Sequence, residues 1–234
     1  MKKQTSVVVA LITMALLINN STAAVMPLDV PSGIMSGVTI NFDGYQDHTI
    51  VNTLYQNQGV TFSRDDGARI YLLDWTSLGR TTTSPDNVLA TVRNFNDPIW
   101  ATHLNIVSTV PLYALGACFG NDQSNLDFNS IRLSAYDTAG GLIGSVDVTT
   151  NNNTAVDQFI GLRSDIPFAR VRFENLTPSG APSASYSVVL DDLKLESVPE
   201  PSTIWIGIGP CLLILVRMAP TGRGRRSNRP AGRQ

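Results

Sequence analysis

The sequence predicts an all-β protein: an antiparallel two-sheet sandwich of the jelly-roll type, with an N-terminal signal helix before it and a C-terminal transmembrane helix after it. Three observations lead to this prediction. Short runs rich in Val, Ile, Phe, Tyr and Thr fill the middle of the chain, turn-forming clusters separate them, and one apolar segment lies near each end. β-branched and aromatic residues favour strands, and regular turn signals between short strands are typical of sandwiches.

Ten runs are predicted as strands, and several of them alternate between apolar and polar residues. Within 131–136, Ile131, Leu133 and Ala135 fall on one face, which predicts a buried side and a solvated side. No stretch of the middle region offers twelve residues at helical period, so a jelly roll is the favoured topology. The predicted strands are 38–42, 59–63, 70–73, 88–92, 103–108, 112–119, 130–136, 142–148, 169–173 and 186–195.

Residues 1–23 have the layout of a secretory signal peptide. Lys2 and Lys3 precede an apolar run at 7–18, and small residues follow it, including Ser21 and Ala23. We expect cleavage after Ala23, with cleavage after Ala24 and an uncut anchor as alternatives. The secretion translocon and signal peptidase are then partners, and residues 24–197 form the exported domain.

The last thirty-seven residues have the layout of a second targeting signal, at the C-terminus. A proline pair at Pro199 and Pro201 leads into an apolar run at 204–216, and every charge after that run is positive. Arginines beside an apolar segment hold that end in the cytoplasm. A helix over about 203–219 is just long enough to span a bilayer core, and 220–234 is then a basic cytoplasmic tail.

This arrangement resembles the PEP-CTERM sorting signal of bacterial surface proteins over 198–226. The resemblance implies processing near the Pro-Glu-Pro by an exosortase, a membrane-embedded cysteine protease, so that a membrane-anchored precursor becomes a cell-surface or extracellular-matrix protein. Pro210 inside the apolar run and the dilute arginine tail depart from the usual pattern. The residues that carry the resemblance are Val198, Pro199, Glu200, Pro201, Ser202 and Thr203, with Arg217, Arg223, Arg225 and Arg226 beyond the apolar run.

The exported domain is acidic and has one cysteine. Between Ala24 and Val198, nine Arg and Lys stand against eighteen Asp and Glu, a net charge near −9. Such a domain repels nucleic acid, which we exclude as a partner. Cys118 has no cysteine partner within the domain, so the fold depends on its core and Cys118 is expected to be a buried apolar residue.

Short pieces of the domain resemble the extracellular jelly-roll domains that often precede PEP-CTERM tails. These pieces are Asn41-Phe42-Asp43, the run at 58–62, the run at 119–122 and Leu190-Asp191-Asp192-Leu193. Those domains are similar to carbohydrate-binding modules, which implies polysaccharide as a ligand. Exposed aromatic residues are candidates for sugar contacts, although residues of this type are more often core; they are Trp75, Trp100, Tyr45, Tyr55 and Tyr71.

Catalytic patterns are missing from the sequence. Neither His48 nor His103 stands in a metal-ligand spacing, and the sequence has no nucleophile elbow, phosphate loop or dinucleotide fingerprint. We therefore expect a non-catalytic envelope or matrix protein. A secreted glycan-active enzyme and a purely structural matrix subunit are the alternatives.

Calcium is the one cofactor that the acidic residues of the domain suggest. If the first and last strands pair, Asp43 meets Asp191 or Asp192, and clustered carboxylates are ligands that Ca²⁺ prefers. The alternative is that all three are ordinary turn and surface acids.

Overall fold

We describe a computed structural model of the chain. It describes residues 24–35, 37–92, 103–120, 130–151, 153, 155–183 and 187–197. The chain divides into two units, Met1–Val198 and Pro199–Gln234. The described residues all belong to the first unit, and the account below concerns that unit alone.

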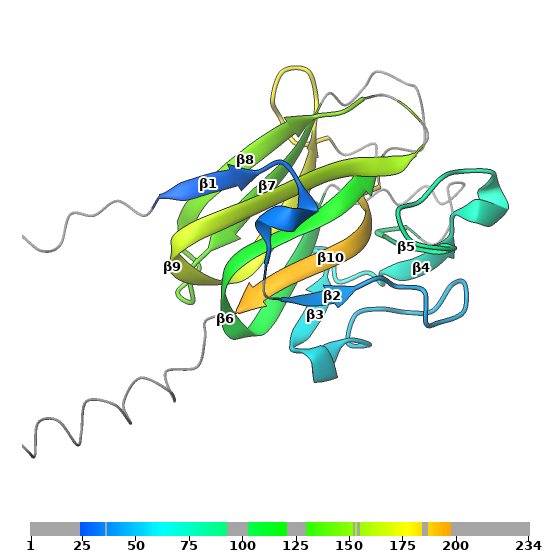
Figure 1. Cartoon of the computed structure of the whole chain (residues 1–234), viewed down its shortest axis with the longest axis horizontal. Coiled ribbons are helices and arrows are strands. Elements are labelled where there is room, and N and C mark those ends of the chain that lie inside the picture. Colours follow the sequence, from blue (N-terminus) through cyan, green and yellow to red (C-terminus); the bar gives the residue numbers. More distant parts are fainter. Residues whose placement is uncertain are drawn as a thin grey trace, which may run out of the picture. The chain divides into compact units, whose positions relative to one another are not determined.

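Ten antiparallel strands form the described fold, together with three single-turn 3₁₀ helices (Figure 1). This confirms the all-β prediction. The strands are β1 (Val25–Leu28), β2 (Val38–Ile40), β3 (Val60–Ser63), β4 (Tyr71–Asp74), β5 (Asn87–Ala90), β6 (His103–Gly120), β7 (Ser130–Tyr136), β8 (Leu142–Thr149), β9 (Val156–Leu176) and β10 (Val189–Ser197); the 3₁₀ helices are η1 (Pro31–Gly33), η2 (Gln56–Gln58) and η3 (Thr76–Leu78).

Two long strands, β6 and β9, bend and take part in both layers of the sandwich. Their pairing register shifts between Val107 and Leu112, which marks the bend. On one side of it, the later part of β6 pairs with β10, and the early part of β9 pairs with β1. On the other side, the early part of β6 pairs with β3, and the late part of β9 pairs with β7, which pairs with β8. We call these the β10 layer, which also contains β2, β4 and β5, and the β7 layer.

The main core lies between the two layers. It is filled from the β7 layer by residues such as Leu133 and Phe173, and from the β10 layer by residues such as Leu115 and Leu190. A second apolar cluster, around Trp75, contains residues of the β10 layer. Apolar area removed from water stabilises such a fold by about 25 cal/mol per Å².

A β-bulge in β10 sets the direction of its acidic side chains. The register with β6 shifts between Asp191 and Lys194, and Asp192 has a φ of 46°, a conformation that Asp adopts more readily than most residues. The extra residue returns Leu193 and Leu195 to the core after Asp191 has pointed the other way. The bulge thus allows two consecutive acids inside a buried strand.

The strand predictions differ from the structure at β1, β6 and β9. β6 is one strand where two were predicted, because Pro111 and its exposed neighbours form the bend rather than a turn. The first half of β9 was not predicted, since Ser164 to Pro167 has the composition of a turn. β1 contains Pro27, which is tolerated in an edge strand. Among the described residues no helix is long and apolar enough to cross a membrane, and the helices predicted near 1–23 and 203–219 lie outside those residues.

Candidate binding face

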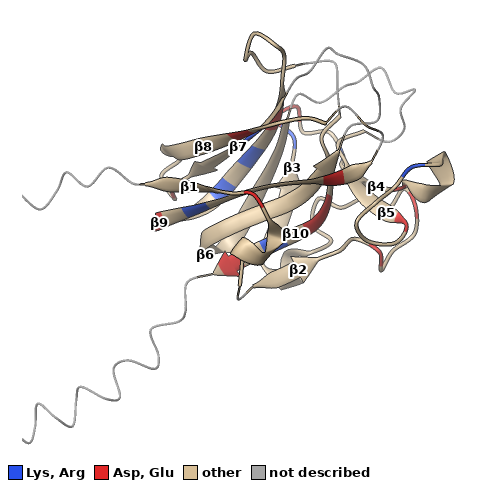
Figure 2. Cartoon of the chain, turned by 45° about the horizontal axis from the view of Figure 1, so that its top comes forward, with Lys and Arg blue, Asp and Glu red and all other residues tan. Residues whose placement is uncertain are grey.

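The outer face of the β7 layer carries three rows of side chains, most of which are polar or charged. Each row crosses the strands in the order β6, β9, β7 and β8, as the register requires. In Figure 2 blue arginine segments follow one another along β9, beside β7. The rows are His103–Glu174–Arg132–Asp147, Asn105–Arg172–Ser134–Ser145 and Val107–Arg170–Tyr136–Leu142.

Ion pairs hold most charges of the first two rows. Arg132 donates two hydrogen bonds to Asp147, at 2.8 and 2.7 Å. Arg172 Nε lies 3.0 Å from Glu174 Oε1, although it does not point along a hydrogen bond, so this contact is electrostatic. These carboxylates are therefore already neutralised by neighbouring arginines.

His103 is locked as a neutral imidazole between Arg172 and Asp65. Arg172 Nη2 lies 2.8 Å from His103 Nδ1, and a guanidinium can only donate, so Nδ1 must accept. Nε2 then carries the proton and donates to Asp65 Oδ2 at 2.6 Å. Burial lowers the pKa of His103 and the Arg172 charge lowers it further, against the opposing effect of Asp65. The imidazole thus connects Arg172 to Asp65 through two hydrogen bonds.

The third row differs, because its arginine has an aromatic partner in place of a carboxylate. The Arg170 guanidinium carbon lies 4.2 Å from the centre of the Tyr136 ring. Within the residues that the structure describes, no carboxylate lies within ion-pair distance of Arg170. Val107 and Leu142 flank the pair and are 39% and 62% exposed. The row therefore offers unpaired donors, an aromatic ring and exposed apolar surface together.

Sequence reasoning did not single out this face. Alternation places Arg132, Ser134 and Tyr136 on the side of β7 opposite Leu133, and the structure confirms this side, although Ser134 itself is buried. The missing information was which strand lies beside β7. Only the pairing of β7 with the late part of β9 brings Arg170 over Tyr136.

The aromatic residues proposed for sugar contacts are mostly unsuitable. Trp75 is 0% exposed and Tyr55 is 4% exposed, so both are core residues. Tyr45 is 43% exposed and packs edge-on against Tyr55. Tyr71 is half-buried, and Trp100 lies outside the described residues.

The three acids of the predicted calcium site lie near one another. β2 pairs with β10, so the segment after β2 brings Asp43 toward the bulge. Burial raises the pKa of Asp43, and the charges of Asp191 and Asp192 raise it further against the hydrogen bonds from Asn87 and Ser84. Burial and the Asp191 charge likewise raise the pKa of Asp192.

Asp191 already has a full set of protein partners. Its buried carboxylate accepts hydrogen bonds from the backbone N–H and hydroxyl of both Thr83 and Ser84, and from the Asp192 N–H, at 2.7–3.1 Å. By contrast, Asp43 Oδ2 is buried without a hydrogen-bond partner. No group of three or more His, Cys, Asp or Glu among the described residues is arranged to hold a metal ion. As arranged, this set does not fit Ca²⁺, and calcium binding stays a prediction of the sequence.

Replacing Asp43 by Asn should raise stability at neutral pH. Because the pKa of Asp43 is raised on folding, the ionised form costs stability above the folded pKa. This cost shrinks as the pH falls through the folded pKa and is lost below the unfolded value of about 3.9. Asn keeps the acceptor for Asn87 N–H and removes the charge. We expect a melting temperature in chelator higher by about 1–3 °C at pH 7 and by clearly less near pH 4, measured by circular dichroism. A lower value at pH 7 would contradict this.

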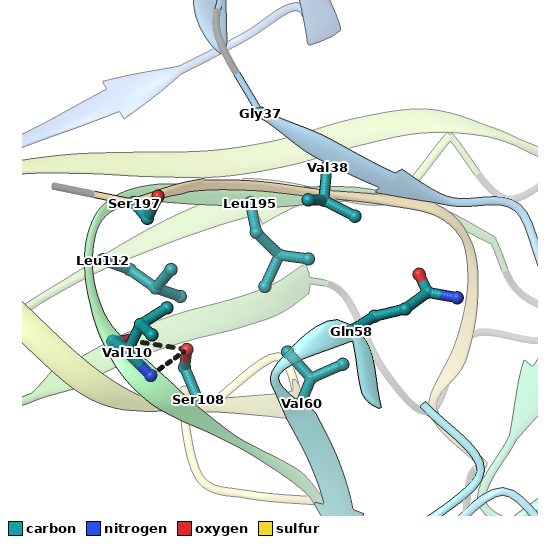
Figure 3. A pocket seen from close by; sticks show the side chains of 9 residues that line it. All are labelled: Gly37, Val38, Gln58, Val60, Ser108, Val110, Leu112, Leu195 and Ser197. Atoms are coloured by element: carbon teal, nitrogen blue, oxygen red, sulfur yellow. Dashed lines mark hydrogen bonds between the residues drawn. The ribbon is translucent and has the colours of Figure 1, made fainter. Parts of the chain in front are cut away.

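A small cleft of about 280 Å³ lies where β6 bends (Figure 3). Its walls are mainly apolar and include Val38, Val60, Leu112 and Leu195. The Ser108 hydroxyl is used locally, because it donates to the Val110 carbonyl at 2.6 Å. The cleft is at the low end of the size of ligand pockets and suits an apolar group at most.

The sorting residues at 198–203 and the arginines from 217 onward lie outside the described residues. The structure therefore leaves the sorting signal as a prediction of the sequence.

No family model matches the chain, and no curated protein matches it. Solved structures that this chain matches in part include the K2 cleaved adhesin domain of Lys-gingipain (12% identity, TM-score 0.45, covering 68% of this chain and 99% of that one). Others are an arabinose-bound α-L-arabinofuranosidase (10%, TM-score 0.46, 71% and 27%) and a DUF4465 family protein from Bacteroides caccae (13%, TM-score 0.35, 75% and 100%). The chain thus spans about a quarter of the arabinofuranosidase. At these scores the likenesses carry no argument about fold or function.

Proposed function

We propose that the chain is an exported, surface-sorted, non-catalytic protein of the cell envelope or extracellular matrix, whose sandwich binds polysaccharide through the row containing Arg170 and Tyr136. The observation that carries the proposal is the arginine that lies over a tyrosine ring without a carboxylate partner among the described residues.

Polysaccharide chemistry fits this row. Sugars present hydroxyl oxygens, and in some polymers carboxylates, to which a guanidinium donates in a fixed fork. Their C–H faces pack against aromatic and apolar groups, which Tyr136, Val107 and Leu142 supply. Because these residues come from adjacent strands, the row runs continuously across the sheet and can contact several units of an extended polymer.

The pairing of the carboxylates supports binding over catalysis. Hydrolysis of a glycosidic bond uses a protonated acid beside an available carboxylate. On this face Asp147 is held by Arg132 and Glu174 by Arg172, while Asp65 accepts from His103 and Asn105. A glycan-active enzyme is the alternative that release of reducing sugars would reveal, and a structural matrix subunit would show neither binding nor release.

Arg170→Gln and Tyr136→Ala should each weaken polysaccharide binding about tenfold. The first removes a charge-assisted contact, and the second removes the ring against which the guanidinium packs. The measurement is affinity electrophoresis of the purified protein through a neutral polymer (xylan) and an acidic polymer (alginate). Binding of an acidic polymer should weaken with salt, whereas binding of a neutral one should not.

Arg80→Gln is the matched control for that experiment. Arg80 also lies over an aromatic ring, 5.0 Å from the centre of Trp75, but it follows η3 and belongs to none of the strands that form the three rows. It should leave retention unchanged. If all three variants migrate like the wild type in both polymers, the face does not bind polysaccharide.

The sorting part of the proposal depends on Pro199, Glu200 and Pro201 before the apolar run and its arginines. The translocon and signal peptidase act first, the helix at about 203–219 anchors the precursor, and an exosortase then processes it. A jelly-roll connection of the strands, as in similar extracellular domains, belongs to the same proposal.

Replacing Pro199, Glu200 and Pro201 by alanines should block maturation. In a host that has the exosortase, the wild type should change from a membrane form to a shorter form, and the variant should accumulate as the membrane form. Immunoblotting of membrane and extracellular fractions follows both. Normal shortening of the variant would exclude the sorting signal.

A further inference from the structure

β1 attaches the start of the described fold to β9, and one carboxylate lies at the end of that attachment. β1 and β9 pair from Val25 opposite Ser164 to Leu28 opposite Gly161 (Figure 1). One residue before this ladder, the Ala24 backbone N–H donates to Asp165 Oδ1 at 2.9 Å, and the Asp165 N–H donates to the Ala24 carbonyl at 3.3 Å. Ala24 is thus held at its nitrogen and at its oxygen by the same residue.

Ala24 is also the residue that signal-peptide cleavage after Ala23 would expose. Cleavage changes the Ala24 nitrogen from a neutral amide to an α-ammonium with three donors. We infer that Asp165 is the counter-ion of the mature N-terminus: it accepts a neutral hydrogen bond in the precursor and a charge-assisted one after cleavage. This inference rests on the export part of the proposed function.

The alternative cut, after Ala24, would not give this arrangement. It would make Val25 the terminus, opposite Ser164, which is buried and has no charge. Both hydrogen bonds of Ala24 would disappear with the residue. Of the two cleavage sites that the sequence allows, only the one after Ala23 places the new charge against a carboxylate.

The neighbouring charged groups are occupied elsewhere. On the half of β9 that pairs with β1, Arg163 forms a two-pronged pair with Glu196, and Asp157 accepts from Asn151 and Asn153. On β8, whose Gly144 lies against Val25, Asp147 is paired with Arg132. Among the described residues of these strands, Asp165 is therefore the carboxylate that contacts the Ala24 nitrogen.

The test measures the reactivity of the α-amine in the processed protein, residues 24–234, in detergent. Mass spectrometry of the N-terminal peptide should first give Ala24 as its first residue. Acetylation rates are then measured at pH 7.5, with Lys194, the only lysine left after cleavage, as an internal reference. Asp165→Asn keeps an acceptor and removes the charge, so its α-amine should react about two- to threefold faster than that of the wild type. About 0.5 M salt should reduce the difference.

Asp29→Asn, at another exposed carboxylate near β1, should react like the wild type. Equal rates for the wild type and Asp165→Asn, or a mature terminus at Val25, would overturn the inference. If the chain is neither exported nor cleaved, the export proposal fails instead. The same rates are then measured on residues 24–234 made with an initiator Met, which is removed before alanine, and they decide the Asp165 contact alone.

Discussion

Leu133→Asp should abolish cooperative folding of the sandwich. Leu133 is 0% exposed and lies in the main core, where the register places it between Val146 of β8 and Phe173 of β9. Burying an unpaired carboxylate there costs several kcal/mol, which is comparable with the whole stability of about 5–15 kcal/mol of a typical domain. Near-ultraviolet circular dichroism and thermal unfolding should show lost tertiary structure and no transition.

Two further variants make this result specific to the direction of the side chain. Leu133→Ala should keep the fold and lower the unfolding free energy by about 2–5 kcal/mol, since it leaves a cavity. Arg132→Ala, one residue away on the outer face, loses a half-exposed ion pair with Asp147 and should cost about 1 kcal/mol or less. Equal tolerance of Leu133→Asp and Arg132→Ala would mean that β7 does not lie with this face inward.

The alternation of apolar and polar residues explains which strands could be predicted from the sequence. At β7 the predicted range 130–136 and the observed strand coincide, because one face meets the core and the other meets solvent. At β9 the pattern fails, since the buried run around Ile160 is followed by the exposed residues Asp165 to Pro167, which are typical of a turn. There the strand continues because both of its halves have partners, one in each layer. Pairing between distant segments outweighs local composition.

The candidate face was harder to predict for a related reason. Its members are ordinary polar residues at alternate positions, and what distinguishes Arg170 is the absence of a carboxylate partner among the described residues. Such a property belongs to neighbouring strands and is not visible in any one of them. The buried position of Trp75 shows the converse, because a tryptophan between polar residues in sequence is covered by the fold.

Asp191→Ala should lower the unfolding free energy by about 3–5 kcal/mol, and the melting temperature by about 10 °C or more. Asp191 is 0% exposed, and its loss leaves the donors of Thr83, Ser84 and Asp192 without their acceptor inside the protein. Unsatisfied buried donors cost about 1–3 kcal/mol each, although relaxation and water entry recover part of this. Urea unfolding monitored by fluorescence gives the difference.

Asp192→Asn is the control. Burial and the Asp191 charge raise the pKa of Asp192, so its ionised form costs stability, and asparagine removes that cost. It should be neutral or slightly stabilising at pH 7. A loss as large as that of Asp191→Ala would show that the bulge needs a carboxylate at 192. Retention of full stability by Asp191→Ala would show that the loop at Thr83 and Ser84 is held by other contacts.

Repeating the Asp191 measurement in chelator and in millimolar calcium decides the calcium prediction. If protein donors are the partners of Asp191, its substitution costs the same in both solutions. A calcium ion shared by Asp43, Asp191 and Asp192 would instead stabilise the wild type by about 2.7 kcal/mol at a hundredfold excess over Kd, and Asp43→Asn would remove that gain. The effect of Asp43→Asn on the unfolding free energy therefore has opposite signs under the two alternatives. The substitution stabilises a domain whose acids only repel one another, and in calcium it destabilises a domain in which they hold an ion.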